Sequence, residues 1–409
     1  MSWFLHLPAR VSILGDLRID LLLVAFLSYL AVVKPAESNV VRTRTDTLLR
    51  ILIVYAIITI PFVEWPGSVI KQGLPNLIKA VVFYYFTIAF IQTEKDLKKF
   101  FFVYLACQAI RILEPLYLHL TEGYWGSKAS MQGGTEFLER LAGGPYDSVN
   151  PNGLAYLVCS ILPFLYFMSD LSWKHRITLF ILAPLSLYVL ALTGSRSGIV
   201  GLGIVGLGIL VKSRHRILLG LVFIIAAGIG FSFLSSDMQD RYLSLVGMGQ
   251  KNLETAEQRS EGMEEQFFVV LHRPIFGHGL GTSPEANYHF TESGPYVGAT
   301  LPAHNLYLEI GQELGLIGVV IFVLFIKSVF TSFAECRRVY QQQNTDGFLP
   351  RLISAMQVWM VMNFVFSFAS YGLSSYDWYL FAGLSVILVR LSKSAENSVE
   401  PNVVLVQKY

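Results

Sequence analysis

Residues 176–212 read RITLFILAPLSLYVLALTGSRSGIVGLGIVGLGILVK. Two apolar runs, near 176–193 and 196–212, flank a short polar hairpin, and each run approaches the about 20 residues that cross the hydrocarbon core of a bilayer. The second run is rich in glycine, which lets helices approach closely in lipid. The stretch therefore predicts two membrane helices joined by a tight turn.

Apolar runs of this kind recur along almost the whole chain. Hydrophobic residues make up 53% of the 409 residues and charged residues only 15%, too few to coat soluble domains. We predict an all-α polytopic membrane protein. Its expected eleven helices lie near 12–33, 48–64, 75–92, 98–120, 152–169, 176–193, 196–212, 216–234, 305–331, 350–371 and 377–392.

The distribution of lysine and arginine predicts the orientation of these helices. Six alternate loops hold most of the basic residues, and such loops stay on the cytoplasmic side. Segments 121–151 and 235–303 then lie on the outer face, where long loops usually carry function. We divide the chain into N-terminal helices over 1–234, an outer loop over 235–303, C-terminal helices over 304–392 and a cytoplasmic tail over 393–409.

Composition also limits the classes of function. The net charge of +2, without a basic block, gives no support for binding to nucleic acid. Cys107, Cys159 and Cys336 lie far apart and match neither a metal motif nor a disulfide framework, so we interpret them as packing residues. Arg10 and Arg18 interrupt the first apolar stretch, which indicates a retained anchor rather than a secretory signal.

The outer loop 235–303 contains one amphipathic pattern. Its apolar residues recur at the spacing of one helix face, and glutamates occupy other positions. These residues are Met263, Phe267, Val270 and Leu271. We expect a helix along the membrane surface that ends at His272-Arg273-Pro274, where proline prevents its continuation.

The hairpin Thr193-Gly194-Ser195-Arg196-Ser197-Gly198 is the first candidate site. Ser195 is placed to cap the following helix, and Arg196 then lies in the first turn, where the helix dipole disfavours a cation. A bound anion would resolve this conflict, and free N–H groups beside a guanidinium suit a phosphate. The alternative is an arginine that reaches toward lipid headgroups.

Three further features could carry chemistry. Arg259 begins the amphipathic helix, although neighbouring glutamates could simply pair with it. His304 stands at the start of a membrane helix and could act as a general base or be a structural residue. Arg111 and Glu114 are one helical turn apart in a membrane helix, and are either a structural ion pair or a pair that lines the substrate site.

A zinc cluster is a weaker alternative for the outer face. It would use His272, His278, His289 and His304, whose spacings match no local ligand motif.

Four segments in this order resemble the O-antigen ligase and O-antigen polymerase superfamily of bacterial envelope enzymes. They are Asn150-Pro151-Asn152-Gly153-Leu154-Ala155, the Thr193–Gly198 hairpin, Arg259 followed by Pro274-Ile275-Phe276-Gly277-His278-Gly279, and His304-Asn305 followed by Glu313-Leu314-Gly315-Leu316-Ile317-Gly318. The resemblance implies a GT-C-like fold and a glycosyltransferase that inverts configuration without a metal or other cofactor.

The resemblance also implies substrates and residue roles. The donor would be a glycan on undecaprenyl pyrophosphate at the periplasmic face of the inner membrane. Arg196 and Arg259 would engage the pyrophosphate, with Arg273 as the rival of Arg259, and His304 would serve the acceptor. Ser195, Asn305, Tyr307, Arg111 and Glu114 complete the candidate substrate-binding set.

The resemblance leaves the acceptor open. A polymerase, which we favour, extends a surface polysaccharide on the lipid carrier, whereas a ligase transfers the glycan to the lipid A core of lipopolysaccharide, and related enzymes transfer it to protein. A flippase or other transporter is the alternative of another class, although such proteins usually place a polar site between paired repeats. Expected partners are the lipid-linked donor, the glycan acceptor, the bilayer, and a chain-length regulator and flippase of the same pathway.

Overall fold

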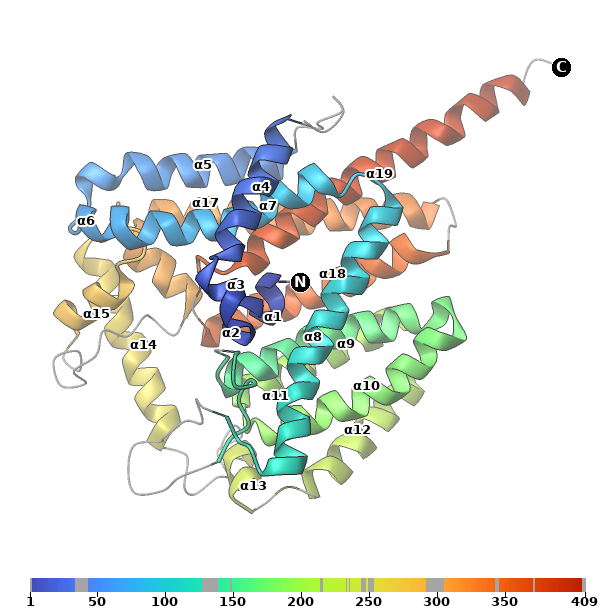
Figure 1. Ribbon diagram of the computed structural model, residues 1–409, viewed down its shortest axis with the longest axis horizontal. Helices are drawn as coiled ribbons and strands as arrows, with labels where there is room; N and C mark the ends of the chain where they lie inside the picture. Colours follow the sequence, from blue (N-terminus) through green and yellow to red (C-terminus); the bar gives the residue numbers. More distant parts are fainter. Residues whose placement is uncertain are drawn as a thin grey trace. The chain divides into compact units, whose positions relative to one another are not determined.

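A computed structural model describes residues 2–33, 43–126, 139–147, 149–213, 216–232, 234, 236–243, 248, 254–291, 305–342, 346–370 and 372–406. Helices dominate these residues, and no strand occurs among them (Figure 1). In α14 before Gly262 and in α19 after Lys393 only the backbone is described. The prediction of an all-α chain is confirmed.

Each predicted apolar run coincides with helical structure. The helices are α1 Ser2–Leu5, α2 Leu7–Arg10, α3 Ser12–Asp16, α4 Ile19–Val33, α5 Arg44–Ile58, α6 Pro66–Ser68, α7 Leu74–Phe90, α8 Glu94–Glu122, α9 Pro151–Met168, α10 Trp173–Leu192, α11 Arg196–Lys212, α12 Arg216–Ser232, α13 Ser236–Leu243, α14 Glu254–His272, α15 Ser283–Phe290, α17 Leu306–Gln342, α18 Phe348–Phe366 and α19 Tyr376–Val406.

Six helices of the described residues are long and apolar enough to cross a membrane. They are Pro66–Phe90, Glu94–Glu122, Pro151–Leu171, Trp173–Leu192, Leu306–Gln342 and Phe348–Ala369. These helices support a multi-pass membrane protein. The count of eleven spans and their orientation stay predictions.

Two predicted helices are interrupted. The run 12–33 forms α3 and α4, and between them Arg18 has a positive φ of 46°, which helical backbone excludes. The run 305–331 belongs to α17, which is kinked at Gly315 with φ 66°. The span predicted near 305–331 lies in a helix long enough to cross a membrane, whereas the run 12–33 is divided between two helices, because an apolar count does not detect a local change of backbone conformation.

The chain forms two compact units, each built from separate stretches. The first contains Met1–Leu27, Lys98–Glu257 and Asp346–Phe366, and the second contains Ser28–Leu97, Gln258–Thr345 and Ser367–Tyr409. The boundaries that we predicted at residues 234, 303 and 392 stay predictions. Helix α19 continues to Val406 through most of the predicted tail.

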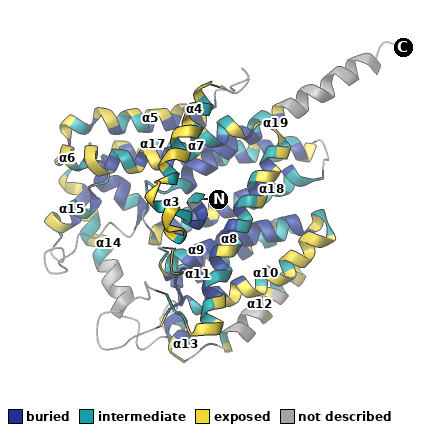
Figure 2. Ribbon diagram, in the orientation of Figure 1, coloured by how far each residue is buried: buried dark blue, intermediate teal, exposed yellow. Residues whose placement is uncertain are grey.

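In the first unit, α9 is the central helix and packs against α10, α11 and α18. Figure 2 shows α9 largely buried and α10 largely exposed. The ring of Phe164 lies 5.3 Å from that of Phe101 and 5.6 Å from that of Trp359. A Cβ atom at Gly198 would lie only 2.6 Å from the Cβ of Ala155, so this glycine allows α11 to approach α9 closely.

In the second unit, α7 packs against α19, and α17 packs against α5 and α19. The rings of Phe325 and Tyr379 lie 6.4 Å apart between α17 and α19, and both side chains are fully buried. Helix α14 ends at His272, as its sequence predicts. Its buried residues include Val269 and Val270, whereas Phe267, Phe268 and Leu271 are exposed.

Candidate functional site

The hairpin between α10 and α11 has the predicted local structure. Helix α10 ends at Leu192, and Gly194 adopts a positive φ of 55°, a conformation that glycine accepts without strain. The Ser195 Oγ accepts a hydrogen bond from the N–H of Gly198 at 3.1 Å. Ser195 is therefore the N-cap of α11, and Arg196 is the first residue of that helix, as predicted.

Three buried arginines contact this hairpin or its neighbour α13. The exposed fractions of Arg140, Arg196 and Arg241 are 4%, 8% and 3%. The Nε of Arg140 donates to the Thr193 carbonyl at 2.8 Å, and that of Arg241 donates to the Gly194 carbonyl at 2.6 Å. The Nε of Arg196 donates in turn to the Arg241 carbonyl at 3.3 Å. Guanidinium groups gathered in this way suit an anionic ligand such as a phosphate.

Asn152 connects the hairpin to the start of α9. Its Oδ1 accepts hydrogen bonds from the Ser195 Oγ at 2.9 Å and from an Nη of Arg140 at 2.8 Å. Asn150 caps α9 by accepting the N–H of Gly153 at 2.8 Å. Two of the segments that carry the family resemblance, 150–155 and 193–198, therefore meet in the first unit.

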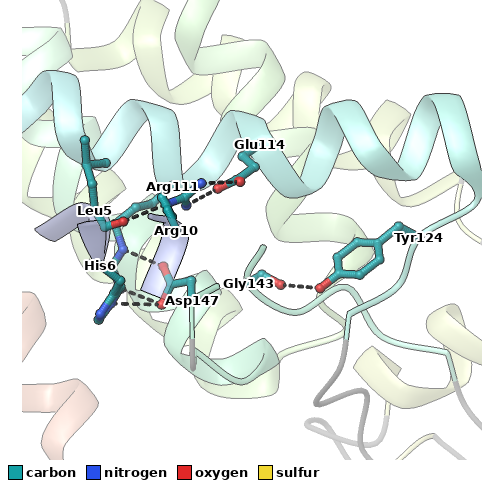
Figure 3. Close-up of polar contacts among 8 residues, drawn as sticks. All are labelled: Leu5, His6, Arg10, Arg111, Glu114, Tyr124, Gly143 and Asp147. Carbon is teal, nitrogen blue, oxygen red and sulfur yellow. Dashed lines mark hydrogen bonds and ion pairs between the residues drawn. The ribbon is translucent and has the colours of Figure 1, made fainter. Parts of the chain in front are cut away.

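A second charged network joins α2, α8 and the segment 139–147 (Figure 3). The guanidinium of Arg111 donates to both carboxylate oxygens of Asp147, at 2.6 and 3.1 Å. His6 lies 3.5 Å from the same carboxylate. The guanidinium of Arg10 donates to Glu114 at 2.6 Å. Arg111 and Glu114, the predicted pair, thus each contact a residue from another part of the chain.

The Asp147 carboxylate is stabilised in its charged form. Burial by itself would raise its pKa, but hydrogen bonds from His6 and Arg111 outweigh burial and lower the pKa to about 2. Both members of the Arg111–Asp147 pair are nearly inaccessible, with exposed side-chain fractions of 8% and 1%. This arrangement favours the structural role for Arg111 over the role in lining the substrate site.

The other two family segments meet in the second unit. The loop 274–281 crosses α17 at its kink, where the N–H of His278 donates to the Gln312 carbonyl at 2.7 Å. The N–H of Leu316 donates to the Pro274 carbonyl, also at 2.7 Å. A Cβ atom at Gly315 would lie 2.3 Å from the Ile275 carbonyl oxygen. Only glycine allows this close crossing.

Side chains of the loop 274–281 and its neighbours make structural contacts. His278 is fully buried, with Nδ1 2.9 Å from Glu64 and Nε2 3.1 Å from the Val269 carbonyl. Its ring stacks on Trp65 with centroids 5.6 Å apart. Arg273 donates to the Phe62 carbonyl at 3.3 Å and lies 3.8 Å from Glu64. These contacts anchor the loop.

The start of α17 contains two of the predicted substrate-binding residues. Asn305 accepts the N–H groups of Tyr307 at 2.9 Å and Leu308 at 3.3 Å, so it caps the helix. The ring of Tyr307 lies 4.6 Å from that of Phe368. The buried carboxylate of Glu309, which the sequence did not single out, accepts the N–H of Gly372 at 2.6 Å.

The structure does not test all the predicted roles. His304 lies outside the described residues, and Arg259 is described only through the backbone of α14. Arg196 and Ser195 belong to the first unit, whereas Arg273, Asn305 and Tyr307 belong to the second. Arg140, Arg241 and Asp147 were missed because they lie in no recognisable motif. Their location in the predicted outer segments was the only signal.

Comparison with known proteins adds an independent finding. Residues 180–323 match the family described as O-antigen ligase. The chain is also 25% identical over 227 residues to an uncharacterized protein of Haemophilus influenzae, and the match covers 52% of this chain and 55% of that protein. The chain thus spans about half the length of the curated relative that it matches. The family match includes the hairpin, α13, α14 and the first part of α17.

Proposed function

Since residues 180–323 match the family described as O-antigen ligase, we propose that the chain is a member of the O-antigen ligase and O-antigen polymerase superfamily and is the polymerase of a surface polysaccharide. It transfers a glycan from undecaprenyl pyrophosphate to a sugar hydroxyl at the periplasmic face of the inner membrane. The observation that carries this proposal is the gathering of Arg140, Arg196 and Arg241 around the 193–196 hairpin, two of them within the matched residues.

The proposed reaction needs stabilisation of a leaving group and removal of one proton. The acceptor oxygen attacks the anomeric carbon of the donor, and the bond from that carbon to the pyrophosphate oxygen breaks with inversion. The pyrophosphate keeps the electron pair, and Arg196 with Arg259 stabilises the developing charge. His304 takes the proton of the acceptor hydroxyl. Atoms and charges balance without a metal ion in this scheme.

The geometry of the hairpin supports the role of Arg196. Arg196 is the first residue of α11, and the backbone N–H groups and the helix dipole at this end attract an anion. The Ser195 cap and the contact with the Arg241 carbonyl fix the direction of the side chain. A fixed cation stabilises a transition state better than a mobile one, because little reorganisation is needed during the reaction.

The catalytic assignment is tested with purified enzyme and a lipid-linked repeat unit. We expect Arg196→Ala and His304→Ala each to lower the rate of polymer formation by about 10²-fold or more. The matched control is Arg176→Ala, which removes an exposed arginine from the first turn of α10 and should leave the rate unchanged. Full activity of Arg196→Ala in correctly folded protein would refute the assignment.

A deletion strain distinguishes the acceptors. Loss of a polymerase leaves single repeat units on the cell surface, whereas loss of a ligase leaves full-length polymer on the lipid carrier. A transporter would instead move lipid-linked sugar across liposomes without forming a glycosidic bond. The first outcome supports the proposal, and the other two contradict it.

A further inference from the structure

A cavity of the first unit is lined by residues away from the hairpin. Its volume is about 760 Å³, and it is lined by α8, α9, α10 and Phe348 at the start of α18. This volume lies within the about 300–1,000 Å³ that is usual for ligand sites. The lining residues fall within 98–109 of α8, 161–168 of α9 and 174–182 of α10. In each of these helices the lining residues lie toward the end that is remote from residues 139–152 and 193–196.

The walls of this groove are almost entirely hydrocarbon. Phe101, Leu105, Phe164, Leu165 and Leu182 are among the side chains that form them. An apolar concave surface between membrane helices is expected to be filled by lipid chains, because its walls offer water no hydrogen-bond partner. The walls alone would accept any acyl chain and do not select a headgroup.

The polar groups of the groove lie on residues near the helix ends. They belong to Lys98, Lys174, His175 and Thr178, and all four residues are exposed. The Nζ of Lys98 lies 5.3 Å from the centre of the Phe348 ring. The Oγ of Ser172 lies 2.6 Å from the Nδ1 of His175. Two ammonium groups beside one apolar groove give it a positively charged mouth.

Two nearby carboxylates, of Asp170 and Asp346, form ion pairs with arginines. Asp170 lies 3.2 Å from the guanidinium of Arg351 and 3.7 Å from that of Arg176. Asp346 lies 2.9 Å from Arg351. Segments 94–99, 170–176 and 346–351, which contain these groups, hold six lysines or arginines and four acidic residues, so this end of the unit has a positive net charge.

We propose that the groove binds an anionic glycerophospholipid, with its acyl chains along α8, α9 and α10 and its phosphate at Lys98 and Lys174. Clusters of basic residues at the cytoplasmic ends of membrane helices attract anionic headgroups, and basic pockets between such helices bind them. The charge pattern of the loops predicts that Lys98 and Lys174 lie on the cytoplasmic side. The site is thus a regulatory or stabilising lipid site of the inner leaflet, distinct from the proposed reaction at the outer face.

Thermal unfolding of the purified full-length chain in neutral detergent tests this proposal. Phosphatidylglycerol should raise the melting temperature in a saturable way, and phosphatidylcholine with the same acyl chains should not. Each of Lys98→Gln and Lys174→Gln should weaken the apparent affinity by about fivefold, and the double variant by about 25-fold. Lys99→Gln is the matched control, because Lys99 is exposed on the same helix but does not line the groove.

A second variant separates the groove from surface charge. Ala106→Trp together with Ala109→Trp fills the apolar part and keeps both lysines, so it should abolish the effect of phosphatidylglycerol. Helix content by circular dichroism reports whether this variant is folded, and single replacements by Leu give a milder form if it is not. Equal stabilisation by phosphatidylcholine, or an unchanged response in the lysine variants, would overturn the proposal. Preferential binding of undecaprenyl phosphate with the same lysine dependence would also overturn it, since the groove would then hold the lipid carrier.

Discussion

The Arg111–Asp147 pair allows a quantitative test of how the first unit is held together. Replacement of Asp147 by Leu leaves the guanidinium of Arg111 in a site where only 8% of that side chain is exposed. Breaking a buried pair on one side costs about 3–5 kcal/mol, because an uncompensated charge stays buried. Replacement of both partners, as Arg111→Met with Asp147→Leu, removes both charges and should change the free energy of unfolding by about 1 kcal/mol or less.

The measurement is the free energy of unfolding in detergent, followed by the loss of helical circular dichroism. The single variant should be clearly less stable than the double variant. Asp170→Leu is the control, because that residue is 65% exposed and its ion pairs should contribute about 0–1 kcal/mol. If Asp147→Leu were as stable as the wild type, or the double variant as unstable as the single one, the pair would not hold the segment 139–147 in place.

Three further predictions concern pH, backbone and activity. Because partners lower the pKa of Asp147 from 3.8 to about 2, its stabilisation of about 2 kcal/mol should be complete above pH 4 and lost toward pH 2 in unfolding experiments. Asp147→Asn should lack that dependence. Gly315→Ala should lower the free energy of unfolding by about 2 kcal/mol or more, since its Cβ would clash with Ile275, whereas Gly203→Ala, with open space around it, should not. Arg241→Ala should lower kcat in a polymer assay about 10²-fold, with less effect on KM. The reason is that loss of the Arg241 contacts displaces the hairpin and misaligns Arg196. An unchanged kcat would show that Arg241 does not position Arg196.

Local patterns predicted local structure well. Apolar runs located the helices, Ser195 capped α11, and the proline after Arg273 coincided with the end of α14. The glycines of α11 allowed the expected close approach, as Gly198 against Ala155 shows. These features succeed because each depends on residues only a few positions apart, where the geometry of a helix fixes what can meet.

The partners of the charged groups could not be predicted in the same way. An i, i+3 ion pair contributes only about 0.2–0.5 kcal/mol, so helical spacing gives a weak preference. Asp147, 36 positions from Arg111, offers two buried hydrogen bonds to one guanidinium and is the stronger partner. Likewise, the break at Gly315 depends on the loop 274–277 lying across α17, and no count of apolar residues contains that information.

Two arginine networks lie in the first unit, and the described contacts of each fix the direction of its guanidinium groups. Arg111 and Arg10 contact carboxylates, which neutralise them. Arg140 and Arg241 donate through Nε to carbonyls at the end of α10, which orients both side chains.

The hairpin therefore lies between the C-terminal, negative end of the α10 dipole and the N-terminal, positive end of the α11 dipole. The carbonyl end of α10 attracts Arg140 and Arg241, which is the favourable position for a cation. Arg196 instead begins α11, where the helix dipole opposes a cation. An anion placed there interacts favourably with the guanidinium and with the helix N-terminus together. By this argument Arg140 and Arg241 position the hairpin, and Arg196 is the arginine of the three that is best placed to contact the pyrophosphate.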